Sequence, residues 1–425
     1  MAARLLDEHP ELGELVQGDL IEGARVDTGR PGLNGDQALR ILLLKQIHGL
    51  SYRELEFHLQ DSGAFRAFAR LPFERTPSFQ TLQANLKRIR PQTFEALHRV
   101  LIGVARQEGI ENGKTIRGDT TVVDADIHEP SDSSLLWDCV RVALRQMKRI
   151  AAVEPALHGS FRDFTRRAKR RAYEIKFSPR RKDLHSGYRD LIRVTEAVAD
   201  QGRALLRRVE GLETPGLERP RRKLHDVLEQ MVRIVDQARR RVLQGEAVPA
   251  AEKLVSIFEA HTDIVVKDHR EVRYGHKVCL SGGRSSLILD CVIEEGNPAD
   301  STLVERTLER HVALFGQAPQ QACFDGGFAS KANVQRAKAL GVQDIAFHRK
   351  AGLEISEMVR SAWVFRRLRN FRSGIEGCIS TLKRAFHMDR CTWRSLRSFH
   401  AYVWSCVTSF NLIALARHKL HRAFA

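Results

Sequence analysis

The sequence predicts an α/β fold in which helices flank a mixed sheet, with a helical N-terminal region and a large helical insertion after the first strand. Residues 114–128 favour a strand, residues 131–260 have only helical patterns, and strands alternate with helices after residue 261. The 425 residues are 43% hydrophobic and 28% charged, which suits a folded protein of two or three domains.

Residues 1–105 are predicted to form a domain of short helices. The segment Gly35–His48 places apolar residues at helical spacing, and Ser78–Ile89 forms another amphipathic helix that ends in Lys87 and Arg88. Short helices with a basic final helix suit a helix-turn-helix DNA-binding domain. A small helical bundle with a solvated basic face fits the same pattern.

The first strand has an acidic residue in an apolar setting. Because side chains alternate along a strand, Asp119 shares a face with Thr121 and Val123, whereas Asp124 and Asp126 lie on the other face. A carboxylate inside an apolar strand is costly unless it is paired or binds a cation. Asp119 is therefore a candidate metal ligand, and a salt bridge to Arg117 is the structural alternative.

The insertion at residues 131–260 is predicted to be long helices with a basic surface. It contains 28 Lys and Arg residues against 18 Asp and Glu residues. An antiparallel helical hairpin with solvated charges explains much of this pattern, because the opposite charges are interleaved. The positive excess favours a surface that faces phosphates.

Strands return after residue 261, and one of them ends at a second acidic candidate. The predicted strands are 262–267, 273–280, 286–293, 321–325 and 344–348, and helices follow the third, fourth and fifth of these. Asp325 ends the fourth and precedes Gly326-Gly327, where functional side chains can emerge at a sheet edge. The alternative is an ordinary Asp-Gly turn.

The third acidic candidate, Glu376, is predicted to open a helix. Ser373-x-x-Glu376 is itself a capping box, so the alternative is that Glu376 only caps its own helix. Lys383 lies seven residues later on the same helical face. Three carboxylates gathered from such settings can hold two divalent ions that activate a nucleophile and stabilise a leaving phosphate oxygen.

The bulk composition indicates a polyanionic partner and a reducing compartment. The net charge of +17 favours nucleic acid. The seven cysteines are scattered and include no C-x-x-C pair, which indicates neither a disulfide framework nor a zinc site. No signal peptide is evident, and Ala401–Ala416 is predicted to be a buried helix and not a membrane span. We expect a cytoplasmic protein.

The acidic motifs together resemble a known family. Asp119-Thr-Thr-Val-Val, Cys-Phe-Asp325-Gly-Gly-Phe and Gly-Ile-Glu376-Gly with Lys383 resemble the DDE transposases of bacterial insertion sequences. The segment from Asp119 to Trp137 is most similar to the ISNCY-type group. The stretch Gly32–Ile89 resembles the N-terminal helical domain of many such transposases. The large insertion directly after the first strand departs from several better-known members.

The resemblance implies an RNase H-like catalytic domain with a five-stranded mixed sheet, made from residues 106–130 and 261–425. It implies that Asp119, Asp325 and Glu376 bind two Mg²⁺ ions, for which Mn²⁺ can substitute, and that Lys383 contacts the transposon end. We expect further basic residues to line the DNA path: Arg349, Lys350, Arg366, Arg367, Arg369, Arg372, Lys87 and Arg88.

The predicted function is Mg²⁺-dependent endonucleolytic cleavage and strand transfer at the ends of an insertion sequence. Double-stranded DNA, as terminal inverted repeats and as target, is the expected partner, and pairing two ends implies a homodimer or higher oligomer in the nucleoid. Two alternatives stay open: an inactive or domesticated DNA-binding regulator, and an RNase H-like nuclease or resolvase that cuts without joining.

Overall fold

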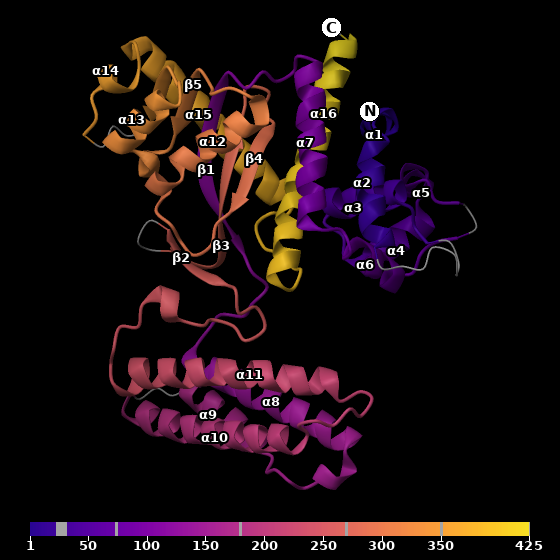
Figure 1. Ribbon diagram of the computed structural model, residues 1–425, viewed down its shortest axis with the longest axis vertical. Coiled ribbons are helices and arrows are strands. Elements are labelled where there is room, and N and C mark those ends of the chain that lie inside the picture. The colour runs from indigo at the N-terminus through magenta and orange to yellow at the C-terminus, as the bar shows by residue number, and fades with distance from the viewer. Residues whose placement is uncertain (23–31, 73–74, 178–180, 268–270, 349–351, 425) are drawn as a thin grey trace. The chain divides into compact units, whose positions relative to one another are not determined.

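The computed structural model describes residues 1–22, 32–72, 75–177, 181–267, 271–348 and 352–424 (Figure 1). The chain forms two compact units, one made from residues 1–126 and 275–425 and the other from residues 127–274. The predicted domain boundaries near residues 105, 130 and 261 stay predictions.

The first unit begins with a series of short helices. Their bounds are α1 (Ala2–Glu8), α2 (Glu11–Ile21), α3 (Gly35–His48), α4 (Tyr52–Asp61), α5 (Gly63–Ala69), α6 (Phe79–Leu86) and α7 (Pro91–Gln107). The predicted helix Gly35–His48 is confirmed as α3, which Asn34 caps and which ends at Gly49 in the left-handed conformation. These helices pack on one another and on the rest of the unit, since α2 contacts α7 and α3 contacts α16.

The basic end predicted for the helix Ser78–Ile89 lies outside that helix. Ser78 caps α6 as expected, but α6 ends at Leu86 and contains no Lys or Arg. Lys87 is the C-terminal cap, and Arg88 follows in a turn. The predicted basic final helix is therefore wrong in its boundary: the Lys87 amide makes the last α-helical bond, to the Gln83 carbonyl, and the Arg88 amide bonds to the Asn85 carbonyl in a turn.

The described residues form a six-stranded mixed sheet, so the expected count of five strands is wrong. The strands are β1 (Thr115–Asp124), β2 (Asp263–Lys267), β3 (Glu271–Gly282), β4 (Ile288–Ile293), β5 (Gln321–Phe324) and β6 (Asp344–Phe347). The order is β2-β3-β1-β5-β6, and β4 pairs with β3. The strands β1, β5 and β6 run parallel, whereas β3 is antiparallel to β1 and to β4.

Helices in the second half of the first unit cover this sheet. They are α12 (Val304–Phe315), α13 (Lys331–Ala339), α14 (Ile355–Met358), α15 (Ala362–Ala385) and α16 (Leu396–Phe424), with 3-10 turns at Asp300–Thr302 and Gly326–Phe328. The helix α15 packs along β1, β5 and β6, and α12 packs on β4. Asp300 begins the 3-10 turn that precedes α12.

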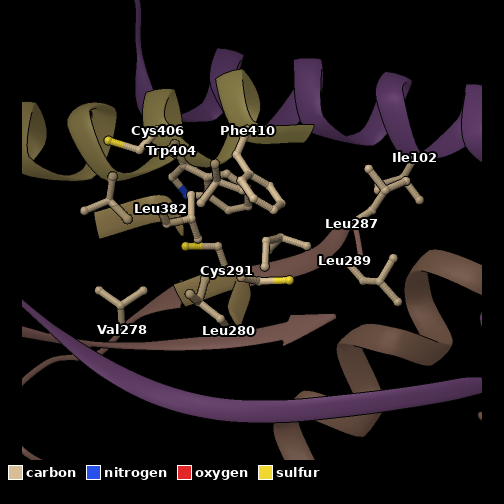
Figure 2. Close-up of a cluster of buried hydrophobic side chains, with 14 of the residues drawn as sticks. Ile102, Val278, Leu280, Leu287, Leu289, Cys291, Leu382, Trp404, Cys406 and Phe410 are labelled. Carbon is tan, nitrogen blue, oxygen red and sulfur yellow. The ribbon is translucent and has the colours of Figure 1, made fainter. Parts of the chain in front are cut away.

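Figure 2 shows the apolar layer between the strands β3 and β4 and the helices α7, α15 and α16. Leu280 and Cys291 from the strands meet Trp404 and Phe410 from α16 there, and all four are buried. The helix α16 is long and apolar enough to cross a membrane, but 83% of its most apolar window is buried inside the protein. The prediction that Ala401–Ala416 is a buried core helix is confirmed.

The second unit contains the helices of the segment predicted as an insertion. Its helices are α8 (Asp132–Val153), α9 (Thr165–Phe177), α10 (Arg181–Arg208) and α11 (Glu218–Ala238), followed by a short π-helical turn at Arg239–Leu243. They share an apolar core of their own. Asp190 pairs with both Arg167 and Arg171, so part of the positive charge of this unit is neutralised locally.

Candidate active site

The strand register places the first two acidic candidates side by side. The parallel pairing of β1 with β5 ends at Gly118 opposite Phe324, so Asp119 and Asp325 are the next residue on each strand. Neighbouring strands lie about 4.8 Å apart. The strand β5 stops there, and the backbone of Asp325 begins the 3-10 turn Gly326–Phe328. Asp325 therefore caps a turn and also presents its side chain beside Asp119.

Two glycines allow the surrounding elements to approach this point closely. A Cβ on Gly118 would lie 2.6 Å from the ring of Phe324, so only glycine lets β5 place this buried phenylalanine against β1. A Cβ on Gly374 in α15 would lie 1.7 Å from the guanidinium of Arg117. Arg117 uses this space to donate a hydrogen bond to the Phe371 carbonyl at 3.0 Å. Gly374 thus fixes α15 against β1.

Glu376 lies in the middle of α15 and does not open a helix. The N-terminal cap of α15 is Ser361, whose side chain accepts a bond from the Val364 amide. The capping-box alternative for Glu376 is therefore wrong. Gly374 is in the helix interior, where the absence of a side chain leaves space for Arg117. Lys383 is on the same continuous helix, as predicted.

Arg372 joins the three acidic side chains. Its Nη1 lies 3.4 Å from Asp119 Oδ2 and 3.4 Å from Asp325 Oδ1, and its Nη2 lies 2.6 Å from Glu376 Oε1. The side chain of Arg372 is 7% exposed, and its Nε has no hydrogen-bond partner among the described residues. The three predicted carboxylates therefore converge on one buried cation.

Arg117 is not the partner of Asp119, so that structural alternative is wrong. The guanidinium of Arg117 lies over the Phe371 ring at 4.6 Å and bonds to Ser286 Oγ at 3.3 Å. Asp124 and Asp126 are also apart from the three carboxylates. The backbone of Asp124 bonds to the segment after α15, and Asp126 pairs with Arg390 at 3.6 Å.

The environment of Asp119 disfavours its charged form. Its side chain is 16% exposed, and burial, together with the nearby charges of Asp325 and Glu376, raises its pKa to about 6. The Thr120 amide, which donates to Asp119 Oδ1 at 2.8 Å, and the Arg372 charge oppose this shift. Asp119 therefore has one oxygen fixed by its own strand and the other directed to Arg372.

A fourth carboxylate, which was not predicted as a site residue, borders the cluster. Asp300 Oδ2 accepts a bond from Thr120 Oγ1 at 3.3 Å, and Asp300 Oδ1 pairs with Lys277 Nζ at 2.9 Å. Thr120 follows Asp119 directly in β1, so its hydrogen bond places Asp300 beside the site. The pattern around Asp300 gave no signal of this contact, because β1 and Asp300 are 180 residues apart.

The residue types of the three candidates suit divalent cations. Carboxylate oxygens are the ligands that Mg²⁺ prefers. In the part of the chain that the structure describes, no group of three or more His, Cys, Asp or Glu residues has metal-binding geometry. The guanidinium of Arg372 lies among the three carboxylates and supplies the positive charge that a metal would otherwise supply.

The residues predicted to line the DNA path have different surroundings. Arg366 and Arg369 are exposed on α15, whereas Arg372 is buried in the carboxylate cluster, where α15 packs on β1 and β5. Arg367 is exposed but bonds to Gln321 and lies over the Trp363 ring. Arg349 and Lys350 lie outside the described residues.

The remaining basic candidates lie at the other end of α15 and near α6. Lys383 is half-buried and pairs with Asp389 at 3.2 Å. Lys87 is exposed and lines the same cavity as Lys383. Arg88 is exposed, but it donates a hydrogen bond to the Leu20 carbonyl at 2.6 Å.

The raised pKa of Asp119 predicts a pH-dependent contribution to stability. The folded state holds the Asp119 proton up to about pH 6, whereas the unfolded chain loses it near pH 4. Relative to Asp119→Asn, the free energy of unfolding of the wild type should fall by about 2–3 kcal/mol between pH 4 and pH 7. Urea unfolding of both proteins in EDTA measures this difference, and a pH-independent difference would contradict the shift.

Two family matches cover more than half of the chain. Residues 3–88 match the family described as Transposase domain (DUF772), and residues 261–412 match the family described as Transposase DDE domain. The second match includes Asp325, Glu376 and Lys383 but not Asp119, which the insertion separates from it in the sequence. No curated protein and no solved structure matches the chain significantly.

The order of the matches agrees with the geometry of the site. The match to the N-terminal transposase domain precedes the match to the DDE domain. The strand β1 lies outside the second match, but in the sheet it pairs with β5, which lies inside that match. Together, these matches show that the chain belongs to the DDE transposases of insertion sequences.

Proposed function

We propose that this transposase cleaves DNA at the ends of its insertion sequence and joins the freed ends to target DNA, with Asp119, Asp325 and Glu376 as ligands for two divalent metal ions. One observation carries the proposal. Three carboxylates from β1, from the end of β5 and from α15 converge on the single cation of Arg372.

The carboxylates differ in what each can contribute. When bound, two Mg²⁺ ions would activate the attacking hydroxyl and stabilise the leaving phosphate oxygen. Asp119 is the rigid member, because the Thr120 amide holds one of its oxygens and its side chain is mostly buried. Asp325 and Glu376 have side chains that are 44% and 56% exposed, so they face the side from which DNA can approach.

Arg372 acts as an internal counter-ion in this proposal. It neutralises part of the negative charge that the three carboxylates bring together, and its charge opposes the rise that burial causes in the pKa of Asp119. The same guanidinium occupies the space between the ligands, so loading the site with divalent ions requires Arg372 to give up at least part of these contacts. Arg372 would then be available to a DNA phosphate.

The surface around the carboxylates suits the DNA backbone. Arg366 and Arg369 are exposed on α15 before the site, and Lys383 lies two turns after Glu376 on the same helix. We infer that double-stranded DNA, as terminal repeat and as target, follows this helix. Joining two ends in one reaction requires at least two copies of the chain, and the N-terminal helices are the proposed reader of the terminal repeat.

A strand-transfer assay tests the function. Purified protein is incubated with Mg²⁺, a labelled duplex that carries the end of the element and a supercoiled target plasmid, and an EDTA reaction serves as the control. Labelled strands joined to the plasmid are the expected product. Cleavage without joining would identify a nuclease or resolvase, and binding without cleavage would identify a DNA-binding regulator.

A further inference from the structure

A cavity of about 710 Å³ in the first unit lies between the N-terminal helices and the segment that follows α15. The end of α3 and the start of α4 form one wall, and the end of α15 with residues 387–394 forms the other. Six of its lining residues bear on its chemistry: Lys45, Tyr52, Lys87, Lys383, Trp393 and Arg394. The cavity is separate from the three carboxylates.

Lys45 brings a buried positive charge to this cavity. Lys45 is 8% exposed, and its Nζ lies 5.0 Å from the centre of the Tyr52 ring and 6.0 Å from the centre of the Trp393 ring. It forms no ion pair within the described residues, and burial lowers its pKa. Glu54 also lines the cavity, but its carboxylate accepts the Ser51 amide in a capping box. A buried cation without a paired anion is costly.

Two buried hydrogen-bond donors line the same cavity without acceptors. In the described chain, neither Trp393 Nε1 nor Tyr52 Oη has a hydrogen-bond partner, and Trp393 is 6% exposed. Each buried donor left without a partner costs about 1–3 kcal/mol. The indole nitrogen can only donate, and the ammonium group of Lys45 can only donate. A ligand that satisfies these groups together must accept hydrogen bonds and carry negative charge.

The two walls of the cavity are locked together. Gln46, next to Lys45, donates from Nε2 to the Phe386 carbonyl at 2.5 Å. Gly49 ends α3 with φ +64°, and a Cβ there would lie 2.5 Å from the His387 ring, so this close packing requires glycine. The donors from α3, from α4 and from the segment after α15 are therefore held in a fixed arrangement before any ligand binds.

The position of the cavity along α15 points to DNA. Lys383 lines it and lies seven residues after Glu376, which is about 10 Å along a helix axis. That distance corresponds to roughly three base-pair steps of B-DNA. A strand that follows α15 with its reactive phosphate at the carboxylates would therefore place a phosphate about three nucleotides away near this cavity. Lys87 and Arg394 add positive charge at its lining, whereas the charge of Lys383 is paired with Asp389, which also lines the cavity.

We propose that this cavity binds one backbone phosphate of the DNA substrate, with Lys45 as its buried cation and with Trp393 and Tyr52 as neutral donors. The identity of the ligand as DNA rests on the proposed function. The consequence is that the N-terminal helices do more than recognise sequence: α3 and α4 complete a phosphate site with the end of the catalytic helix.

The test compares Lys45→Met, Tyr52→Phe and Trp393→Phe with the wild type, and exposed Lys114→Met serves as the control for loss of one positive charge. Binding to a duplex that carries the element's end is measured by fluorescence anisotropy over a range of salt concentrations in EDTA, where no cleavage occurs. Lys45→Met should weaken binding by about tenfold and lower the salt slope by about one. Each aromatic variant should weaken binding by a few-fold without changing the slope.

Thermal unfolding separates this role from a structural one. Lys45→Met should unfold at the wild-type temperature or above it, because it removes a buried unpaired charge. Unchanged DNA affinity and salt slope in Lys45→Met would overturn the proposal. If inorganic phosphate stabilises the wild type but not Lys45→Met while DNA binding is unaffected, the site binds free phosphate and the DNA assignment is wrong. Because all readouts are of binding, failure of cleavage would contradict only the proposed function.

Discussion

Replacing any one of the three carboxylates with its amide, as Asp119→Asn, Asp325→Asn or Glu376→Gln, should reduce DNA end cleavage by roughly a thousandfold or more. Each change removes a ligand charge from the centre that stabilises the transferring phosphate, and such metal-dependent stabilisation is worth several kcal/mol. The shapes of the side chains are kept, so DNA binding in EDTA should stay within about threefold of the wild type.

Glu309→Gln is the matched control, because Glu309 is an exposed carboxylate on α12 away from the cluster. It should cleave at the wild-type rate. The assay is cleavage of a labelled duplex in Mg²⁺ and, separately, in Mn²⁺. Wild-type cleavage by any one of the three amide variants would remove that residue from the set of ligands and leave the other two assignments intact.

The sequence predicted Asp119 and Asp325 from local physical arguments. A carboxylate among β-branched residues needs a partner, and a strand that runs into two glycines exposes its last side chain. Their proximity was not predictable, because β1 and β5 are about 200 residues apart in the sequence and meet only through the parallel register that ends at Gly118 and Phe324. The insertion of four helices does not disturb this pairing, since it has a core of its own.

The prediction that Glu376 opens a helix failed because a Ser-x-x-Glu pattern, which suits a capping box, also occurs inside a longer helix. Gly374 instead accommodates the guanidinium of Arg117 from β1, a tertiary contact that the local pattern does not contain. The sequence pattern did predict a strand at residues 262–267, which the structure confirms as β2; only the count of five strands, which came from the resemblance, is wrong.

Arg372 shows most clearly what single-sequence reasoning omits. We predicted that Arg372 lines the DNA path because it ends a basic run with Arg366 and Arg369. Its spacing of four residues from Glu376 was a usable signal of an ion pair on one helical face. What could not be predicted was that Asp119 and Asp325 reach the same guanidinium from the sheet.

Replacing Arg372 with methionine should therefore destabilise the metal-free protein and strengthen its affinity for divalent ions. Without the guanidinium, Asp119 is left buried beside two other acidic groups, which should lower the free energy of unfolding at neutral pH by about 1–3 kcal/mol. The ligands would no longer be shared with an internal cation, so Mn²⁺ should bind about tenfold more tightly and restore the lost stability. Urea unfolding with and without Mn²⁺ and electron paramagnetic resonance of free Mn²⁺ measure these effects without DNA or catalysis.

Arg369→Met is the control, because Arg369 is an exposed arginine on the same helix and contacts none of the three carboxylates. It should leave both stability and Mn²⁺ affinity unchanged. If Arg372→Met loses stability but binds Mn²⁺ no more tightly, Arg372 is only a structural brace and does not compete with metal. If it binds Mn²⁺ more tightly and yet cleaves DNA poorly, the guanidinium acts first as a counter-ion in the DNA-free protein and then in DNA cleavage. Arg372 would then have two roles: its positive charge prevents a loss of stability before DNA binds, and the same charge takes part in cleavage afterwards.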